Sequence, residues 1–429
     1  MKDERRIRNP RAVLFGLLPP GGTGLLAGES PLEELAALAE AAGARVLARS
    51  VQRREAPHPA TFLGKGKALE LARTITQREA DLAICDQELT PAQGRNLERL
   101  LGVRVLDRTE LILDLFATRA RTAQARAQVE LARLEYALPR LRRMWGHLDR
   151  ERGGIGLRGA GEKQIESDRR LIRKRVQDLK KTLERIQARA LRKVRGRRGR
   201  FKVCLVGYAN AGKSSLMNAL AGAGVVTADR PFSTLDTRTR TLDLGEGRKA
   251  LLSDTVGFIR NIPHHLVASF QATLAEAVHA DLLLHVVDVS RPSFPEDVEV
   301  VEGVLASIGA GEIPRVLLLN KVDLLEDALP LTLAGRLHPE GLPVSARTGR
   351  GLEELAVLLG ERARPRPLVV ELHVPFQVPG MEAVLRRHAT VLEREWREDG
   401  LYARIRTDQA GLRALLREGC RTLGEGNPP

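Results

Sequence analysis

Short apolar runs alternate with amphipathic stretches over the first 116 residues. The apolar runs are Ala12–Leu18, Arg45–Leu47, Leu82–Cys85 and Val103–Leu106, and the amphipathic stretches between them include Pro31–Ala42 and Lys67–Gln77. This alternation is typical of parallel strands joined by helices. We therefore expect an N-terminal α/β domain over residues 1–116.

A longer helical pattern follows, from about Asp107 to Leu141, with Pro139 predicted to kink it. After a loop at 146–161 a second helix is predicted, because apolar residues alternate at spacings of three and four. These residues are Ile165, Ile172, Val176, Leu179, Leu183, Ile186 and Ala190. Such a seam indicates coiled-coil packing. We expect an antiparallel helical hairpin over residues 117–199, with Val194–Arg200 as a linker.

The apolar strand at Phe201 predicts a second α/β domain over residues 200–365, with a mainly parallel sheet and a boundary at the RPRP sequence. A small α+β domain, 366–429, is expected to complete the chain. Its predicted elements are a strand at Leu368–Val374, a helix at Met381–Arg397, a strand at Leu401–Arg406 and a helix at Gln409–Glu418. The fold class is therefore multidomain α/β.

The charge of the chain is concentrated in the predicted hairpin. Between Arg119 and Arg200 there are 26 Lys/Arg and 9 Asp/Glu, a surplus of 17 (26 − 9), whereas the whole chain carries +15. A local surplus of this size is typical of a surface that binds a phosphate backbone. A solvated helical face is the alternative interpretation of any charge run.

Other features of the composition narrow the class of protein. The cysteines Cys85, Cys204 and Cys420 are widely spaced, which indicates neither a disulfide framework nor a zinc site. No stretch approaches the length needed to span a bilayer, and the N-terminus lacks the pattern of a signal peptide. We expect a cytoplasmic protein.

A phosphate-binding loop follows the predicted strand at 201–207. Gly207–Ser214 reads GYANAGKS, which fits GxxxxGK[ST] between a strand and a helix. Its backbone N–H groups can surround phosphates at the helix N-terminus. Lys213 can reach the β- and γ-phosphates, and the Ser214 hydroxyl is a hard oxygen ligand for Mg²⁺.

The remaining motifs indicate a guanine nucleotide, each at the end of a predicted strand. Asp323 of NKVD can accept from the N1–H and N2–H₂ donors of guanine, which adenine lacks. Ser345-Ala346 fits the loop whose backbone N–H reaches the guanine O6. In DTVG, Asp254 is placed to hold a Mg²⁺-bound water, and the Gly257 N–H can reach the γ-phosphate. Thr234, between this motif and the phosphate-binding loop, is placed to close over the Mg²⁺.

We predict Lys213, Thr234, Asp254 and Gly257 as catalytic residues, and Ser214 and Thr234 as metal ligands. GTP and GDP are the predicted substrate and product, with Mg²⁺ as cofactor. The predicted nucleotide-binding residues are Gly207, Tyr208, Ala209, Asn210, Ala211, Gly212, Lys213, Ser214, Ser215, Phe232, Ser233, Thr234, Leu235, Asp236, Asp254, Thr255, Val256, Gly257, Asn320, Lys321, Val322, Asp323, Ser345, Ala346 and Arg347.

One position departs from the pattern of many GTPases, which place a water-orienting Gln directly after DxxG. Here that residue is Phe258, whose ring cannot orient water by hydrogen bonding. We therefore predict slow intrinsic GTP turnover, with the missing group supplied by a partner or another residue. Arg260 and Arg238 are the candidates within the chain.

Several segments together resemble the HflX family of ribosome-associated GTPases. They include FLGKGK (62–67), ELTPAQGRNLE (88–98), the stretch 106–136 and GGIGLRGAGEKQIESDRR (153–170), and PFSTLDTRTR fits the family's switch region. The resemblance implies binding to the large ribosomal subunit and its RNA, ribosome-stimulated hydrolysis, and ribosome splitting or rescue. It also implies that the glycine-rich loop 153–162 approaches the peptidyl transferase region. Ala160 and Lys163 depart from the family's usual GPGETQ.

Two further hypotheses stay open at this stage. One is an RNA-binding or remodelling protein whose GTPase domain only senses nucleotide, and the other is an interaction scaffold with vestigial hydrolysis. Intact Lys213, Ser214, Thr234 and Asp254 argue against the scaffold. We expect a monomer without a membrane span, a fraction of which associates with membranes.

Overall fold

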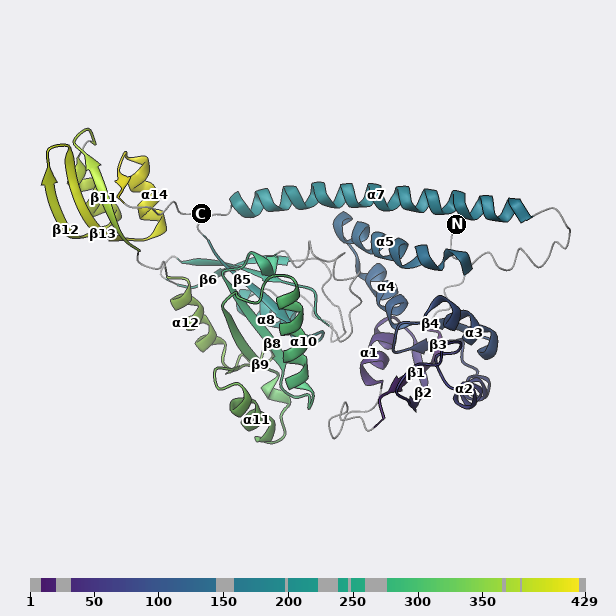
Figure 1. Cartoon of the computed structure of the whole chain (residues 1–429). Coiled ribbons are helices and arrows are strands. Elements are labelled where there is room, and N and C mark those ends of the chain that lie inside the picture. Colours follow the sequence, from purple (N-terminus) through teal and green to yellow (C-terminus); the bar gives the residue numbers. More distant parts are fainter. Residues whose placement is uncertain are drawn as a thin grey trace. The chain divides into compact units, whose positions relative to one another are not determined.

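The computed structural model, drawn in Figure 1, describes most of the chain. The described residues are 9–20, 32–143, 158–196, 200–222, 238–245, 248–258, 276–364, 368–378 and 380–423. They form two compact units: one comprises Met1–Asp243 and Lys249–Leu355, and the other Leu244–Arg248 and Ala356–Pro429. No helix in the described part has both the length and the apolarity to cross a membrane.

The first sheet is the predicted N-terminal α/β layer. Its strands are all parallel, in the order β2-β1-β3-β4. Apolar residues fill both faces: Val13 and Phe15 of β1 pack with α2 and α3, and Leu14 packs with α1 and α4. The elements are β1 (Arg11–Leu18), α1 (Glu33–Ala41), β2 (Arg45–Arg53), α2 (Lys65–Arg78), β3 (Leu82–Cys85), α3 (Pro91–Leu101), β4 (Arg104–Leu106) and α4 (Arg108–Arg119).

Local sequence signals explain where helix α3 begins and ends. The Thr90 hydroxyl accepts from the Gln93 backbone N–H, and the Gln93 side chain accepts from the Thr90 N–H, which is a complete capping box. Pro91 occupies the first turn, where its missing N–H costs nothing. Gly102 ends the helix with φ 71°, a conformation that glycine adopts without strain.

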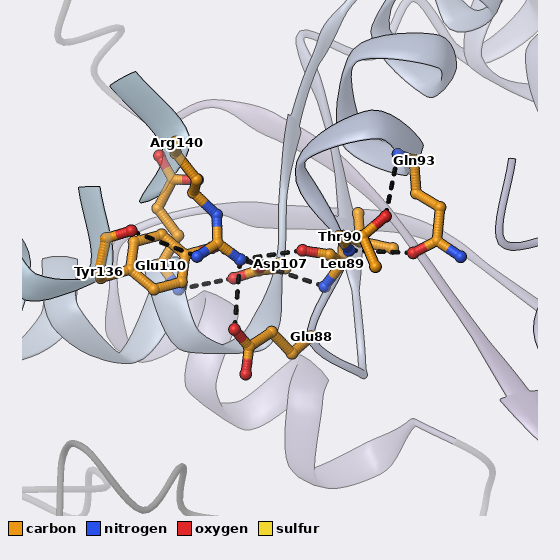
Figure 2. Close-up of polar contacts among 8 residues, drawn as sticks. All are labelled: Glu88, Leu89, Thr90, Gln93, Asp107, Glu110, Tyr136 and Arg140. Atoms are coloured by element: carbon orange, nitrogen blue, oxygen red, sulfur yellow. Dashed lines mark hydrogen bonds and ion pairs between the residues drawn. The ribbon is translucent and has the colours of Figure 1, made fainter. Parts of the chain in front are cut away.

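A buried carboxylate joins this sheet to the helices that follow (Figure 2). Asp107, only 3% exposed, accepts from the backbone N–H groups of Leu89 and Glu110 and from the side chains of Tyr136 and Arg140. The Arg140 guanidinium also lies 3.5 Å from the centroid of the Tyr136 ring. Burial and the neighbouring Asp107 carboxylate raise the pKa of Tyr136, which keeps its hydroxyl a donor. The start of the hairpin is thus fixed to the α/β sheet.

The predicted first helix of the hairpin is interrupted. Helix α4 ends at Arg119, and a new helix starts because the Thr122 hydroxyl caps the Ala125 N–H at 3.1 Å. Pro139 lies in a 3₁₀ turn rather than in a kinked α-helix. The elements are α5 (Ala123–Ala137), η1 (Leu138–Arg143) and α7 (Arg158–Gly196). Because α7 begins at Arg158, the predicted loop 146–161 is wrong for its last four residues. Because α7 continues to Gly196, the predicted linker from Val194 is wrong for its first three.

Helices α5 and α7 lie side by side, as Figure 1 shows. The predicted seam is the least exposed stripe of α7 in its described part, with Leu179 only 5% exposed. Two ion pairs join the helices: Arg175 with Glu130 at 2.7 Å, and Lys180 with Glu135 at 2.8 Å. The other faces of α7 are solvent-exposed between residues 166 and 186.

The second sheet has the order β10-β9-β8-β5-β7-β6 and is parallel except for the edge strand β6. Its central strands β5 and β8 are almost wholly buried, which is typical of a parallel sheet covered on both faces. The elements are β5 (Phe201–Gly207), α8 (Lys213–Ala221), β6 (Arg238–Asp243), β7 (Lys249–Asp254), β8 (Leu282–Asp288), α10 (Phe294–Ser307), β9 (Arg315–Asn320), η2 (Val322–Leu324), α11 (Leu329–Leu337), β10 (Leu342–Pro343) and α12 (Leu352–Arg362).

The C-terminal unit contains an antiparallel sheet in the order β12-β13-β11-β14. The predicted helix Met381–Arg397 is wrong beyond His388, since Thr390–Arg397 is a strand. The Glu and Arg residues of Thr390–Arg397 favour a helix by local propensity. In the structure Val391 and Trp396 pair with β13, and this tertiary pairing outweighs the local propensity. The elements are β11 (Leu368–Pro375), α13 (Met381–His388), β12 (Thr390–Arg397), β13 (Gly400–Thr407), α14 (Gln409–Arg417) and β14 (Arg421–Thr422).

Candidate nucleotide site

The candidate residues lie at the carboxyl ends of parallel strands. Gly207 ends β5, Asp254 ends β7, Asn320 ends β9, and Ser345 follows β10. In an open α/β sheet, ligands bind at this edge. The sheet order places these strand ends along one edge, with β8 between β9 and β5, as the sequence predicted.

The loop from Gly207 to Gly212 has the conformation of a phosphate-binding turn. Asn210 and Gly212 have φ values of 64° and 96°, and helix α8 starts immediately afterwards at Lys213. A side chain at position 212 would meet the Asn320 Nδ2 atom at 2.2 Å from its Cβ. Glycine is therefore required there by both conformation and space.

Lys213 is folded back over this loop and is only 6% exposed. Its Nζ atom donates to the backbone carbonyls of Gly207 at 2.9 Å and Tyr208 at 2.7 Å. Burial lowers the pKa of Lys213 to about 8. Its ammonium is thus held at the loop, where an anionic group would raise its pKa again.

Ser214 and Asp254 contact each other beside the loop. The Ser214 hydroxyl donates to the Asp254 Oδ2 atom at 2.6 Å, and the Asp254 side chain is fully buried. Next to it the Thr255 hydroxyl donates to the Leu205 carbonyl at 2.7 Å, which fixes the start of the DTVG turn. The pair presents two hard oxygen donors of the kind Mg²⁺ prefers.

The residue after DTVG is bound into the phosphate-binding loop by its backbone. The Phe258 N–H donates to the Gly207 carbonyl at 3.1 Å, and the Phe258 carbonyl accepts from the Ala209 N–H at 2.6 Å. Its side chain is 3% exposed. At Gly257 an added Cβ would lie 2.8 Å from the Ala209 Cα and 2.9 Å from the Lys213 Nζ, so this turn is closely packed.

Asn320 links three segments of the site. Its Nδ2 donates to the Ala211 carbonyl at 2.8 Å, and its Oδ1 accepts from the Ala346 N–H at 3.1 Å. The NKVD motif therefore connects the phosphate-binding loop to the Ser345-Ala346 loop. This bridging role was not part of the sequence prediction.

The base-reading candidates lie on two neighbouring loops. Asp323 is exposed, and its Oδ1 accepts from the Ser345 hydroxyl at 2.6 Å. The same hydroxyl oxygen accepts from the Thr348 N–H at 3.1 Å, and Arg347 is exposed beside it. Val322 is buried in the turn below them.

Sequence reasoning missed Asp288 at the end of β8. It forms an ion pair with Lys321 at 2.7 Å, and Lys321 has a positive φ of 67°. This pair orients the lysine of NKVD. A carboxylate ending the apolar strand LLLHVVD was the available signal, because polar side chains at strand ends gather at this edge.

Some predicted residues lie outside the described part of the chain. They are Phe232, Ser233, Thr234, Leu235, Asp236 and Arg260, together with residues 153–157 of the glycine-rich loop. Tyr208, Ala209, Ser215 and Val256 lie within the loop, helix α8 and the DTVG turn where the motifs placed them. Arg238 lies on β6 opposite Asp254.

Fold and site together define a P-loop GTPase. Residues 29–117 match the family described as GTP-binding GTPase N-terminal, 119–197 match GTP-binding GTPase Middle Region, and 202–321 match 50S ribosome-binding GTPase. GTPase HflX of Escherichia coli is 44% identical over 377 residues, covering 86% of this chain and 87% of that protein. The chain belongs to the HflX family of ribosome-associated GTPases.

Two other proteins are similar to this chain. GTPase HflX of Magnetococcus marinus is 46% identical over 394 residues, covering 91% of this chain and 90% of that protein. The crystal structure of a GTP-binding protein from Sulfolobus solfataricus with GDP is 27% identical, covers 82% of this chain and 98% of that chain, and has a TM-score of 0.44.

Proposed function

We propose that this chain is a Mg²⁺-dependent GTPase that binds the large ribosomal subunit, is stimulated there to hydrolyse GTP, and splits or rescues ribosomes. The observation that carries the proposal is Phe258. Its backbone closes on the phosphate-binding loop and its ring is buried, so this position offers no group that can orient water. In this proposal a partner, the large ribosomal subunit, completes the site.

The chain's own residues suit the binding and positioning part of the reaction. Lys213 would hold the β- and γ-phosphates, with its lowered pKa returning upward beside these anions. Asp323 would accept from the guanine donors, and the backbone N–H of Arg347, which follows Ser345-Ala346, would face the guanine O6. In phosphoryl transfer most of the catalysis comes from such positioning and charge neutralisation.

The donor set fits Mg²⁺. The Ser214 hydroxyl would be a direct ligand, and Asp254, 2.6 Å from it, would hold a water of the ion's shell, with Thr234 as the second protein ligand. When bound, the ion would neutralise charge on the β- and γ-phosphates. Gly257, pressed against the loop, would bring its N–H towards the γ-phosphate.

The hairpin supplies the surface for ribosomal RNA in this proposal. The exposed faces of α7 carry Arg170, Lys174, Lys181 and Arg185, which form no ion pair among the described residues. Folded RNA is bound mainly through its shape and phosphates, which suits a rigid basic helix. The glycine-rich segment 153–162, whose last five residues open α7, would approach the peptidyl transferase region.

Binding is tested by sedimenting the full chain with large ribosomal subunits in GDP or in a non-hydrolysable GTP analogue. The double variant Lys174→Gln/Lys181→Gln should bind less tightly and show a salt dependence shallower by about two charges. The matched control Arg336→Gln/Arg362→Gln removes two exposed cations from α11 and α12. Equal binding by both variants would refute the proposed interface on α7. Equal binding in GDP and in the GTP analogue would refute nucleotide-dependent binding to the subunit.

A further inference from the structure

The C-terminal unit has a feature that the GTPase proposal does not use: all its large aromatic side chains lie outside its core. Its buried cluster is aliphatic, built from residues such as Leu372, Ile405 and Leu415. Residues 366–429 contain three Phe, Trp or Tyr residues, and these are Phe376, Trp396 and Tyr402. The strand pairing brings them to one end of the sheet but to both of its faces, because Trp396 pairs with buried Leu401 whereas Tyr402 lies on the opposite face.

Phe376 and Trp396 form an exposed stack. Their ring centroids are 6.1 Å apart with an interplanar angle of 10°, and the residues are 53% and 52% exposed. Aromatic rings normally supply core or interface packing, because their large apolar area gains most from leaving water. A half-exposed stacked pair is therefore a surface available to a further flat ring.

A second stack lies on the face of the sheet opposite to the helices, where the His373 side chain is 12% exposed and Tyr402 is half-buried. Helices α13 and α14 pack on the face formed by alternate residues such as Leu372 and Ala403. His373 of β11 and Tyr402 of β13 are register partners on the opposite face, with ring centroids 4.7 Å apart. The Arg397 guanidinium continues the stack, 4.3 Å from the Tyr402 ring centroid.

Both a carboxylate and cations lie at these rings. Asp399, whose side chain is 60% exposed, lies 3.3 Å from the His373 Nε2 atom and accepts from the Tyr402 hydroxyl at 2.9 Å, while the surrounding arginines can contact phosphates. Two acidic residues of β12 are already ion-paired: Glu393 with Arg404 at 3.5 Å and Glu395 with Arg397 at 2.8 Å. Arg406, two residues from Arg404 on the same face, and Arg421, the register partner of His373, form no ion pair within the described residues.

Topology adds an independent argument. The unit runs strand-helix-strand-strand-helix-strand, and its sheet order β12-β13-β11-β14 places β11 and β13 at the centre. A four-stranded sheet with rings on its central strands is a recurrent platform for unpaired bases, which stack on aromatic side chains and arginine planes. His373 and Tyr402 occupy these central strands.

We propose that the aromatic end of this unit, defined by Phe376, Trp396, His373, Tyr402 and Arg397, binds unstacked bases of single-stranded RNA. A protein partner is less suited, because the charged side chains of Arg397 and Asp399 lie directly against the Tyr402 ring and its hydroxyl. The proposal is independent of the GTPase site and of the basic hairpin. It gives the C-terminal unit a function of its own.

The test uses the full chain with Trp145→Phe, which leaves Trp396 as the only tryptophan of the chain's two. Titration with a ten-nucleotide single-stranded RNA should quench the Trp396 fluorescence, and the same sequence as a duplex should not. Because this signal arises at the C-terminal unit, RNA bound to the hairpin does not produce it. Unchanged fluorescence at RNA concentrations that saturate the chain would overturn the proposal.

Variants then measure the contribution of each ring. Trp396→Ala and Tyr402→Ala, each in the otherwise unchanged full chain, should weaken binding of a labelled single strand by about fivefold to a hundredfold. The binding that remains in these variants is measured at several salt concentrations, because binding of RNA to the basic hairpin depends strongly on salt. The matched control is Leu392→Ala, which shortens an apolar side chain of β12 that is 40% exposed. Equal effects of all three, or quenching by ribosomal proteins but not by RNA, would contradict base stacking.

Discussion

Gly212→Ala tests whether the link through Asn320 organises the nucleotide site. The new Cβ would lie 2.2 Å from the Asn320 Nδ2, so the amide must move. Movement breaks its hydrogen bonds to Ala211 at 2.8 Å and Ala346 at 3.1 Å. At about 0.5–1.5 kcal/mol each, the two bonds amount to about 1–3 kcal/mol. GDP should therefore bind about 5- to 150-fold more weakly.

A matched control separates this contact from backbone strain. Gly222 at the end of α8 also has a positive φ, of 61°, but an added Cβ there meets nothing within 4 Å. Gly222→Ala should lower the free energy of unfolding by about 1 kcal/mol and leave GDP affinity unchanged. Affinities for GDP are measured by calorimetry on both variants. Equal affinities would refute the proposed role of Asn320.

Three further predictions concern other sites. Burial lowers the pKa of His285 from 6.5 to about 3, so below pH 6.5 the unfolded chain binds a proton that the folded chain does not. The free energy of unfolding should therefore be constant above pH 6.5 and about 2 kcal/mol lower at pH 5, whereas urea titrations of His285→Leu should show no such decrease. Tyr136→Phe removes a donor to buried Asp107 and should lower the stability of the hairpin junction by about 1–3 kcal/mol, seen as faster hydrogen exchange in α5; unchanged exchange would contradict it. Asp323→Asn should shift nucleotide preference from GTP towards xanthosine triphosphate, and competition binding with unchanged specificity would reject the assignment of the base site.

The spacing of apolar residues predicted the N-terminal sheet, the mainly parallel second sheet and the seam of α7. These elements bury one or both faces along their whole length. Val13, Phe15 and the apolar strand LLLHVVD carry this signal in consecutive residues. The strand Thr390–Arg397 was mistaken for a helix because it lies at a sheet edge and is mostly exposed. Its pairing with β13 depends on residues distant in the chain, which local patterns do not reveal.

The motifs predicted which residues lie at the strand ends but not the hydrogen bonds and ion pairs between them. Spacing indicated Asn320 as part of NKVD, whereas its bridge from Ala211 to Ala346 depends on two turns folded together. The same holds for Asp288 with Lys321 and for Asp107 with Tyr136. Such contacts join positions up to 109 residues apart, so no sequence window contains both partners.

The most direct test of the proposed function is GTP turnover by the full chain with and without large ribosomal subunits. Buried Phe258 leaves the position after DTVG without a water-orienting group, so the chain alone should hydrolyse GTP slowly. Saturating large subunits should raise the turnover at least about tenfold, and small subunits should not. Equal turnover with and without large subunits would contradict the account.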